Sequence, residues 1–357
     1  MNSKKFYGIE LLRFFTSLSV ILFHYKLFFL PSNDFATNSI SSIKDQLPFY
    51  NFLEIFYMYG NFGVPIFYTI SGFVFAHVYL YLRKKITYKI FFINRFARLY
   101  PLHFATLILV GILQYINFFD VNYFLFTSNN NFYYDFYHFF LQLFFISSWG
   151  FEHGPSFNTP IWSVSVEIAI YIFFFLILHF LQKYKFVLTI CISILLLVLA
   201  KTGLVDSLFL ECARLFFSGI LVYLIIRSLD YKKYLIFLSL FLLTLSFVGN
   251  FKIYLFCPAL LLFFAIIDEF IKNIRIRFFF QSCGSLTYSL YLLHISVQIF
   301  IMMLVNKFNI QESVYLSNFF WIFYIFTMFF LSYFSFSIYE KPLNKLIRKK
   351  FNKDYKN

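Results

Sequence analysis

The chain has 357 residues, of which 61% are hydrophobic and only 13% are charged. In soluble domains about 25% of the residues are charged, so this composition excludes a soluble globular fold. The net charge of +14 does not indicate nucleic-acid binding, because the lysines and arginines cluster in alternate loops, as the positive-inside rule requires of a membrane protein.

Repeated apolar stretches of about 18 residues or more predict an all-α fold, a polytopic transmembrane bundle of about ten helices. The charge pattern places both termini in the cytoplasm. We expect residues 1–343 to form the membrane domain and residues 344–357 to form a basic cytoplasmic tail on the anionic inner leaflet. The predicted spans are 8–30, 55–82, 98–117, 160–181, 186–204, 208–227, 234–249, 253–271, 284–306 and 317–338.

The first predicted span holds Glu10, Arg13 and His24. Ten residues separate Arg13 from His24, so the two lie on nearly the same helical face, roughly 16 Å apart. Ionisable side chains at membrane depth are costly and indicate function by default. Glu10 is three residues before Arg13 and can pair with it. The span lacks a small-residue cleavage site, so we interpret it as a retained first helix and not as a signal peptide.

The second predicted span contains Ser71 and Gly72 within a stretch that favours close helix packing or a kink. At the start of the third span, Arg95 and Arg98 share one helical face. Two arginines so placed suit a phosphate group. They are equally typical of the positive-inside rule and of contact with lipid headgroups, and the residues alone leave both interpretations open.

The longest predicted loop, 118–159, is expected outside the cytoplasm. Its apolar stretch 135–147 is too short to span and should lie at the interface or re-enter. The fourth span then opens with Trp162 and Ser163, and Trp162 also suits a simple interfacial anchor. Glu167 follows at membrane depth, where a carboxylate must be paired or take part in function.

Arg214 in the sixth span and His294 in the ninth add two further ionisable groups at membrane depth. Together with the groups of the first and fourth spans, they predict a polar cavity. The four cysteines lie on scattered segments, and we interpret them as small apolar side chains and not as a disulfide or metal-binding set. The chain has no P-loop and no usual metal-ligand spacing, so we expect no metal and no tightly bound cofactor.

Taken together, these motifs resemble the membrane-bound acyltransferase-three family, the O-acetylases of bacterial surface polysaccharides. The resemblance covers about residues 6–343 and departs from the family where Glu10 and Leu11 replace a common Asp-Gly. It rests on six elements: Arg13 with His24; Ile70 to Phe73; Arg95, Arg98, Tyr100 and Pro101; Trp162, Ser163, Ser165 and Glu167; Tyr288, Ser289, Tyr291 and His294; and Glu340 with Pro342.

The resemblance implies transfer of an acetyl group from cytoplasmic acetyl-CoA to a hydroxyl of a surface polysaccharide or lipid-linked glycan, at the bacterial inner membrane. For such a reaction, Arg95 and Arg98 could hold the phosphates of coenzyme A, and His24 could act as the general base on the acceptor hydroxyl. Arg13 would stabilise the thioester oxygen or position the donor. Glu167 would orient a histidine or bind sugar hydroxyls. Direct transfer and a covalent acyl-enzyme both stay open.

Two other functions use similar charges. A transporter or flippase for a sugar-linked lipid needs alternating access and often has inverted repeats, which we do not see in this sequence. A glycan polymerase is usually marked by a large extracytoplasmic loop with arginines, and 118–159 contains none.

Overall fold

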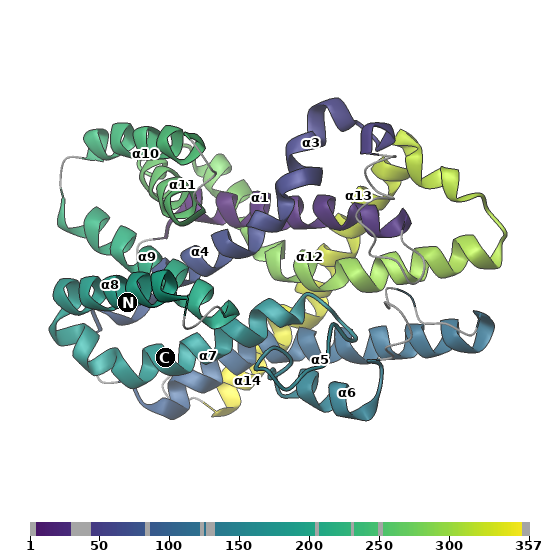
Figure 1. Cartoon of the computed structure of the whole chain (residues 1–357), viewed down its shortest axis with the longest axis horizontal. Helices are drawn as coiled ribbons and strands as arrows, with labels where there is room; N and C mark the ends of the chain where they lie inside the picture. Colours follow the sequence, from purple (N-terminus) through teal and green to yellow (C-terminus); the bar gives the residue numbers. More distant parts are fainter. Residues whose placement is uncertain are drawn as a thin grey trace. The chain divides into compact units, whose positions relative to one another are not determined.

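The computed structural model describes residues 5–29, 44–82, 86–121, 125, 133–203, 207–229, 232–248 and 253–351 (Figure 1). Throughout these residues the regular structure is helical, with no strand, which confirms the predicted all-α class. Within the described residues, eight helices are long and apolar enough to cross a membrane, and two shorter apolar helices cover 234–247 and 253–267. Each of the ten predicted spans therefore overlaps a helix, and the orientation of the termini stays a prediction.

The α-helices are α1 (Tyr7–His24), α3 (Tyr50–Tyr59), α4 (Gly63–Tyr79), α5 (Tyr88–Val121), α6 (Phe136–Leu143), α7 (Ile161–Lys183), α8 (Lys185–Thr202), α9 (Leu208–Ser228), α10 (Lys232–Phe247), α11 (Ile253–Ile267), α12 (Ile274–Lys307), α13 (Asn318–Phe334) and α14 (Lys341–Phe351). Short 3₁₀ segments cover Tyr25–Phe29, Lys44–Gln46, Gly60–Phe62 and Glu312–Leu316, and a π-helical segment covers Ser335–Glu340.

Several helices extend beyond their predicted spans. Helix α5 begins at Tyr88 and α12 at Ile274, each ten residues before the predicted start. The predicted spans follow hydropathy, which detects only the apolar part of a helix. Basic residues such as Arg95 and Arg277 lower the hydropathy of a segment, but the backbone hydrogen bonds of the helix continue through them. At the other end, α13, the π-helical segment and α14 follow one another to Phe351, so the predicted start of the tail at 344 falls inside a helix.

The chain packs as two compact units. The first unit comprises residues 1–16, 62–88 and 166–285, and the second comprises residues 17–61, 89–165 and 286–357.

In the first unit, α4 and α9 pack backbone against backbone. A Cβ atom added at Gly72 would overlap the carbonyl oxygen of Phe216, and one added at Gly219 would overlap that of Thr69. Reciprocal glycines of this kind let two membrane helices approach closely, so that van der Waals contacts hold them together. The structure confirms the prediction that Gly72 permits a close approach.

The start of α1 is also fixed within the first unit. The carboxylate of Asp268 is buried and accepts hydrogen bonds from the backbone N–H groups of Tyr7 (2.6 Å) and Gly8 (3.2 Å). The first N–H groups of a helix lack intrahelical partners and carry the positive end of the helix dipole. A carboxylate is therefore a suitable cap.

In the second unit, the stretch predicted to be too short to span forms the eight-residue helix α6. Asp135 caps it by accepting hydrogen bonds from both the backbone N–H and the ring Nδ1 of His138, each 2.8 Å long. Burial opposes ionisation of this carboxyl, but the two hydrogen bonds outweigh it and hold the pKa of Asp135 below its usual value.

We predict that Gly72→Ala lowers the melting temperature of the purified protein by several degrees, because overpacking costs roughly 1–3 kcal/mol. Gly111→Ala is the matched control, since its Cβ would meet only the Phe157 ring at an ordinary 3.5 Å. Alanine favours helix at both positions. A Gly72→Ala protein as stable as the Gly111→Ala protein would contradict close packing of α4 and α9.

Candidate functional site

The predicted site residues divide between the two units. The first unit holds Glu10, Arg13, Ser71, Glu167 and Arg214. The second unit holds His24, Arg95, Arg98, Trp162, Ser163 and His294. A single polar cavity lined by all of them stays a prediction, and each group is described within its own unit.

Two histidines form the centre of one polar group in the second unit. His24 is the last residue of α1, and its Nδ1 lies 3.0 Å from Nε2 of His294 in α12. Their ring planes are nearly parallel, with an angle of 13° between them and centroids 5.0 Å apart. His294 is fully buried and His24 is half-buried. The sequence predicted each histidine as a candidate but did not predict that they touch.

Gln298 supports the same histidine and was missed by the sequence reasoning. Its Nε2 donates a 2.8 Å hydrogen bond to the backbone carbonyl of His24. The last carbonyls of an α-helix lack intrahelical partners, so Gln298 ties down the end of α1. Gln298 lies four residues after His294 and therefore on the same face of α12. That spacing was visible in the sequence and could have indicated it.

The serine predicted at the start of α7 reaches the same helix α12. Ser163 Oγ lies 2.7 Å from the hydroxyl of Tyr291, and both oxygens lie within 3.2 Å of the carbonyl of Pro160, so one hydroxyl can donate to the other while that other donates to the carbonyl. The carbonyl of Tyr291 in turn lies 2.8 Å from Nδ1 of His294. Trp162 is half-buried beside Ser163. Two motifs of the predicted site are thus joined to the histidine pair by direct contacts.

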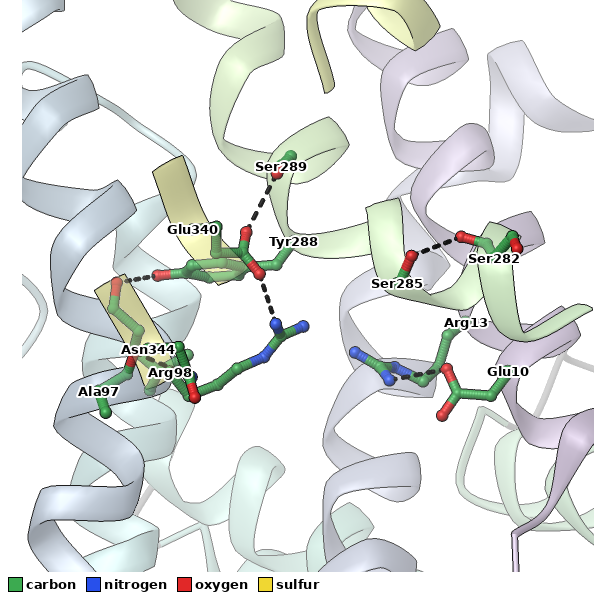
Figure 2. Close-up of polar contacts among 11 residues, drawn as sticks. Glu10, Arg13, Ala97, Arg98, Ser282, Ser285, Tyr288, Ser289, Glu340 and Asn344 are labelled. Carbon is green, nitrogen blue, oxygen red and sulfur yellow. Dashed lines mark hydrogen bonds and ion pairs between the residues drawn. The ribbon is translucent and has the colours of Figure 1, made fainter. Parts of the chain in front are cut away.

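A second polar group of this unit surrounds Arg98 of α5 (Figure 2). Its Nη1 forms an ion pair with Oε1 of Glu340, whose side chain is 1% exposed. The other oxygen of Glu340 accepts a 3.0 Å hydrogen bond from Ser289 Oγ. A carboxylate buried this deeply is stable only when its oxygens are satisfied. Arg98, Ser289 and Glu340 come from three separate motifs of the sequence, and the fold brings them together.

The π-helical segment and α14 contact α5 next to a proline. Pro101 has no N–H, so the carbonyl four residues earlier, that of Ala97, loses its intrahelical donor. Asn344 of α14 donates a 3.0 Å hydrogen bond to that carbonyl (Figure 2). Tyr339 donates to the carbonyl of Pro101 (3.2 Å). Sequence reasoning missed Asn344, although a proline within a helix always leaves a carbonyl without its intrahelical donor.

These contacts refine the predicted phosphate site. Arg95 is half-buried and lies three residues before Arg98 on the same helix. Because Glu340 neutralises one of the two charges, the group carries one net positive charge and not the predicted two. Arginine has five N–H donors, and Glu340 engages Nη1. The group thus combines charge with directed donors, as recognition of a phosphate requires.

In the first unit, Arg13 Nη1 and Glu10 Oε2 form a 3.0 Å ion pair (Figure 2), which confirms the predicted pairing. Gly284 of α12 leaves room for Glu10, since an added Cβ would overlap its carboxylate. The guanidinium of Arg214 lies 3.4 Å from the ring centroid of Tyr254, a cation–π contact.

Ser71 and Glu167 complete the predicted residues of the first unit. The hydroxyl of Tyr171 donates to Ser71 Oγ at 3.5 Å. Glu167 is half-buried in α7. Nothing in these contacts assigns either residue a chemical step, and the roles implied by the resemblance stay predictions.

A buried network in the second unit was also missed. In α5, Nε2 of His103 lies 2.8 Å from the backbone carbonyl oxygen of Gln142. Asn158 donates to Thr106 Oγ1 (2.9 Å) and to the carbonyl of Leu292 (3.1 Å). These bonds join α5, α6, the segment before α7 and α12. Across the part of the chain that the structure describes, no cluster of three or more His, Cys, Asp or Glu side chains could hold a metal ion.

Comparison with known families identifies most of the chain. The model of the acyltransferase-three family, described as an acyltransferase domain, matches residues 6–337. No curated protein and no solved structure matches the chain significantly. The matched region contains the histidine pair and both arginines of α5, and it ends three residues before Glu340.

The contact between Asn344 and Ala97 predicts a dependence on Pro101. Asn344→Leu should lower thermal stability, because it leaves a buried carbonyl without a donor; hydrogen bonds at membrane depth average about 0.6 kcal/mol. Pro101→Ala restores an N–H that can bond the Ala97 carbonyl. In that background Asn344→Leu should cost clearly less, as a double-mutant cycle of melting temperatures would show. Strictly additive losses would rule out the shared carbonyl.

Proposed function

Because the chain belongs to the acyltransferase-three family, we propose that this multi-pass membrane acyltransferase moves an acetyl group from cytoplasmic acetyl-CoA to a hydroxyl of a surface polysaccharide or lipid-linked glycan. The proposed compartment is the bacterial inner membrane. The observation that carries the proposal is the position of His24, a half-buried imidazole held by His294 and Gln298. Such a group is suited to removing a proton from a hydroxyl.

In the proposed reaction, His24 takes the proton of the acceptor hydroxyl while the hydroxyl oxygen attacks the thioester carbonyl. A C–O bond forms, the C–S bond breaks, and the proton passes from His24 to the sulfur of coenzyme A. No outside oxidant or reductant is needed. Direct transfer requires only one base, and the arrangement of His24 supplies it.

The donor is proposed to bind through its phosphates to Arg95 and Arg98. Coenzyme A is a polyanion that does not enter the apolar bilayer, so its phosphates need a cationic site at the membrane surface. The positive-inside pattern places the start of α5 on the cytoplasmic side. Glu340 supports this role by holding one nitrogen of the Arg98 guanidinium, which leaves its planar fork oriented before the donor arrives.

The first test is His24→Ala in the full-length protein in lipid nanodiscs, assayed by transfer of labelled acetyl to a glycan acceptor. Loss of a general base typically costs about 10²–10⁴-fold in rate. His179→Ala is the control, because His179 is exposed on α7; it should retain wild-type activity. A folded His24→Ala protein with unchanged acetyl transfer would remove the base from the mechanism.

The same variants distinguish the transporter alternative in cells. An acetyltransferase predicts that surface glycans of the His24→Ala strain keep their sugar chain and lose acetyl groups, as seen by mass spectrometry. Loss of the glycan itself, with acetylation of the remainder unchanged, would favour transport of a sugar-linked lipid.

The donor site is tested with two acyl donors. Arg95→Ala combined with Arg98→Ala should raise the KM for acetyl-CoA by roughly 10–100-fold, because charge-assisted hydrogen bonds to the phosphates are lost. Lysine at both positions should rescue only in part. Acetyl-pantetheine lacks the nucleotide phosphates, so its KM should not change. An equal loss with both donors would assign the arginines to stability and not to phosphate binding.

A further inference from the structure

We propose that His294 is a positioning residue that fixes the proton of His24 on Nδ1, so that Nε2 of His24 is the basic atom. The proton assignment follows from hydrogen bonds within the second unit. Its catalytic consequence rests on the proposed function.

The assignment begins at Tyr291. Its backbone carbonyl lies 2.8 Å from Nδ1 of His294. A carbonyl oxygen can only accept a hydrogen bond, so Nδ1 of His294 carries a proton. A neutral imidazole has one N–H, and Nε2 of His294 therefore presents a lone pair.

That lone pair faces His24. Nε2 of His294 and Nδ1 of His24 are 3.0 Å apart, which is a hydrogen-bond distance. Two lone pairs at this distance would repel, so Nδ1 of His24 must carry the proton and donate it. Nε2 of His24 then holds the lone pair of the neutral pair.

Exposure separates the roles of the two rings. His294 is fully buried, with 0% of its surface accessible, so it has no surface to offer an acceptor or a donor. His24 is half-buried, and its ring is kept in place by the contact with Nε2 of His294, while Gln298 donates to its backbone carbonyl. His24 is thus the residue that can meet the substrate, and His294 acts only through it.

The histidine pair can also hold the proton that His24 takes from the acceptor hydroxyl. When Nε2 of His24 takes the proton of the hydroxyl, the Nδ1 proton can move along the hydrogen bond to Nε2 of His294. The positive charge is then shared with a ring whose Nδ1–H already donates to the Tyr291 carbonyl. Return of both protons delivers one to the departing thiolate and restores the starting tautomers.

Two substitutions of His294 separate positioning from packing. His294→Gln keeps an acceptor near the place of Nε2, whereas His294→Leu fills similar space without one. Loss of the partner that orients a metal-bound histidine typically costs about 10–100-fold, and we take the same range for His24. We expect His294→Leu to lower kcat by that factor with little change in the KM for acetyl-CoA, and His294→Gln to retain most of the activity. Equal losses in both variants would overturn the positioning role.

A spectroscopic measurement tests the tautomer without any acetyl transfer. Nitrogen-15 NMR of the full-length protein with labelled histidines distinguishes protonated from unprotonated ring nitrogens, and the His24 signals are those missing in His24→Gln. We expect a protonated Nδ1 and an unprotonated Nε2 for His24 in the wild type and in His294→Gln, with this preference lost in His294→Leu. A wild-type His24 protonated on Nε2 would overturn the inference.

The two readouts separate this inference from the proposed function. If the expected tautomer is found in a protein that transfers no acetyl group, the proposed function fails and the proton assignment stands. If acetyl is transferred by a protein whose His24 carries its proton on Nε2, the proposed function stands and the inference fails.

Discussion

The requirement that every polar group in an apolar medium find a partner governs the second unit. Water cannot reach a carbonyl or a carboxylate that is buried in the protein, and each such group left without a partner costs roughly 2–7 kcal/mol. Pro101 frees the carbonyl of Ala97, and Glu340 brings a carboxylate with 1% exposure. Asn344 of α14 donates a hydrogen bond to the Ala97 carbonyl in α5, and Arg98 of α5 pairs with the Glu340 carboxylate in the π-helical segment. A π-helical turn is itself a departure from regular hydrogen bonding that is often found at functional positions. Here it ends at Glu340.

Helix positions were predictable from the sequence because apolar length is a local property. Helix ends were not, because the first turns of α5 and α12 are polar and continue the same backbone hydrogen bonding. The break in the second span between α3 and α4 was partly foreseeable, since glycines and a proline occur there. The continuation of α13 into α14 was not foreseeable, because Pro342 favoured a stop. In the structure Pro342 lies directly after the π-helical segment, as the second residue of α14, and the helical run continues through it.

The same contrast holds for the site. The pair of Glu10 and Arg13 could be predicted because three residues on a helix fix the distance. His24 and His294 were each predicted as unusual, yet 270 positions separate them, and only the packing of α1 and α12 brings their rings together. The charge of the arginine pair was overestimated for a similar reason: the partner of Arg98 stands 242 positions away. Local rules identify which residues are costly to bury, and the fold decides what offsets that cost.

The choice of a second histidine as the partner of His24 has a physical consequence. A carboxylate would hold the imidazole in the same tautomer and would stabilise the imidazolium more strongly, as in the serine hydrolase triad. It would also place a full negative charge at membrane depth, where desolvation is expensive unless a cation is paired with it. Glu340 illustrates that demand, because it requires both Arg98 and Ser289. A neutral imidazole accepts the hydrogen bond of Nδ1 without any net charge, and its own N–H needs only the carbonyl of Tyr291. On the proposed mechanism, the imidazolium of His24 is then only modestly stabilised. It returns its proton readily to the departing thiolate, which favours completion of the transfer over accumulation of a charged intermediate.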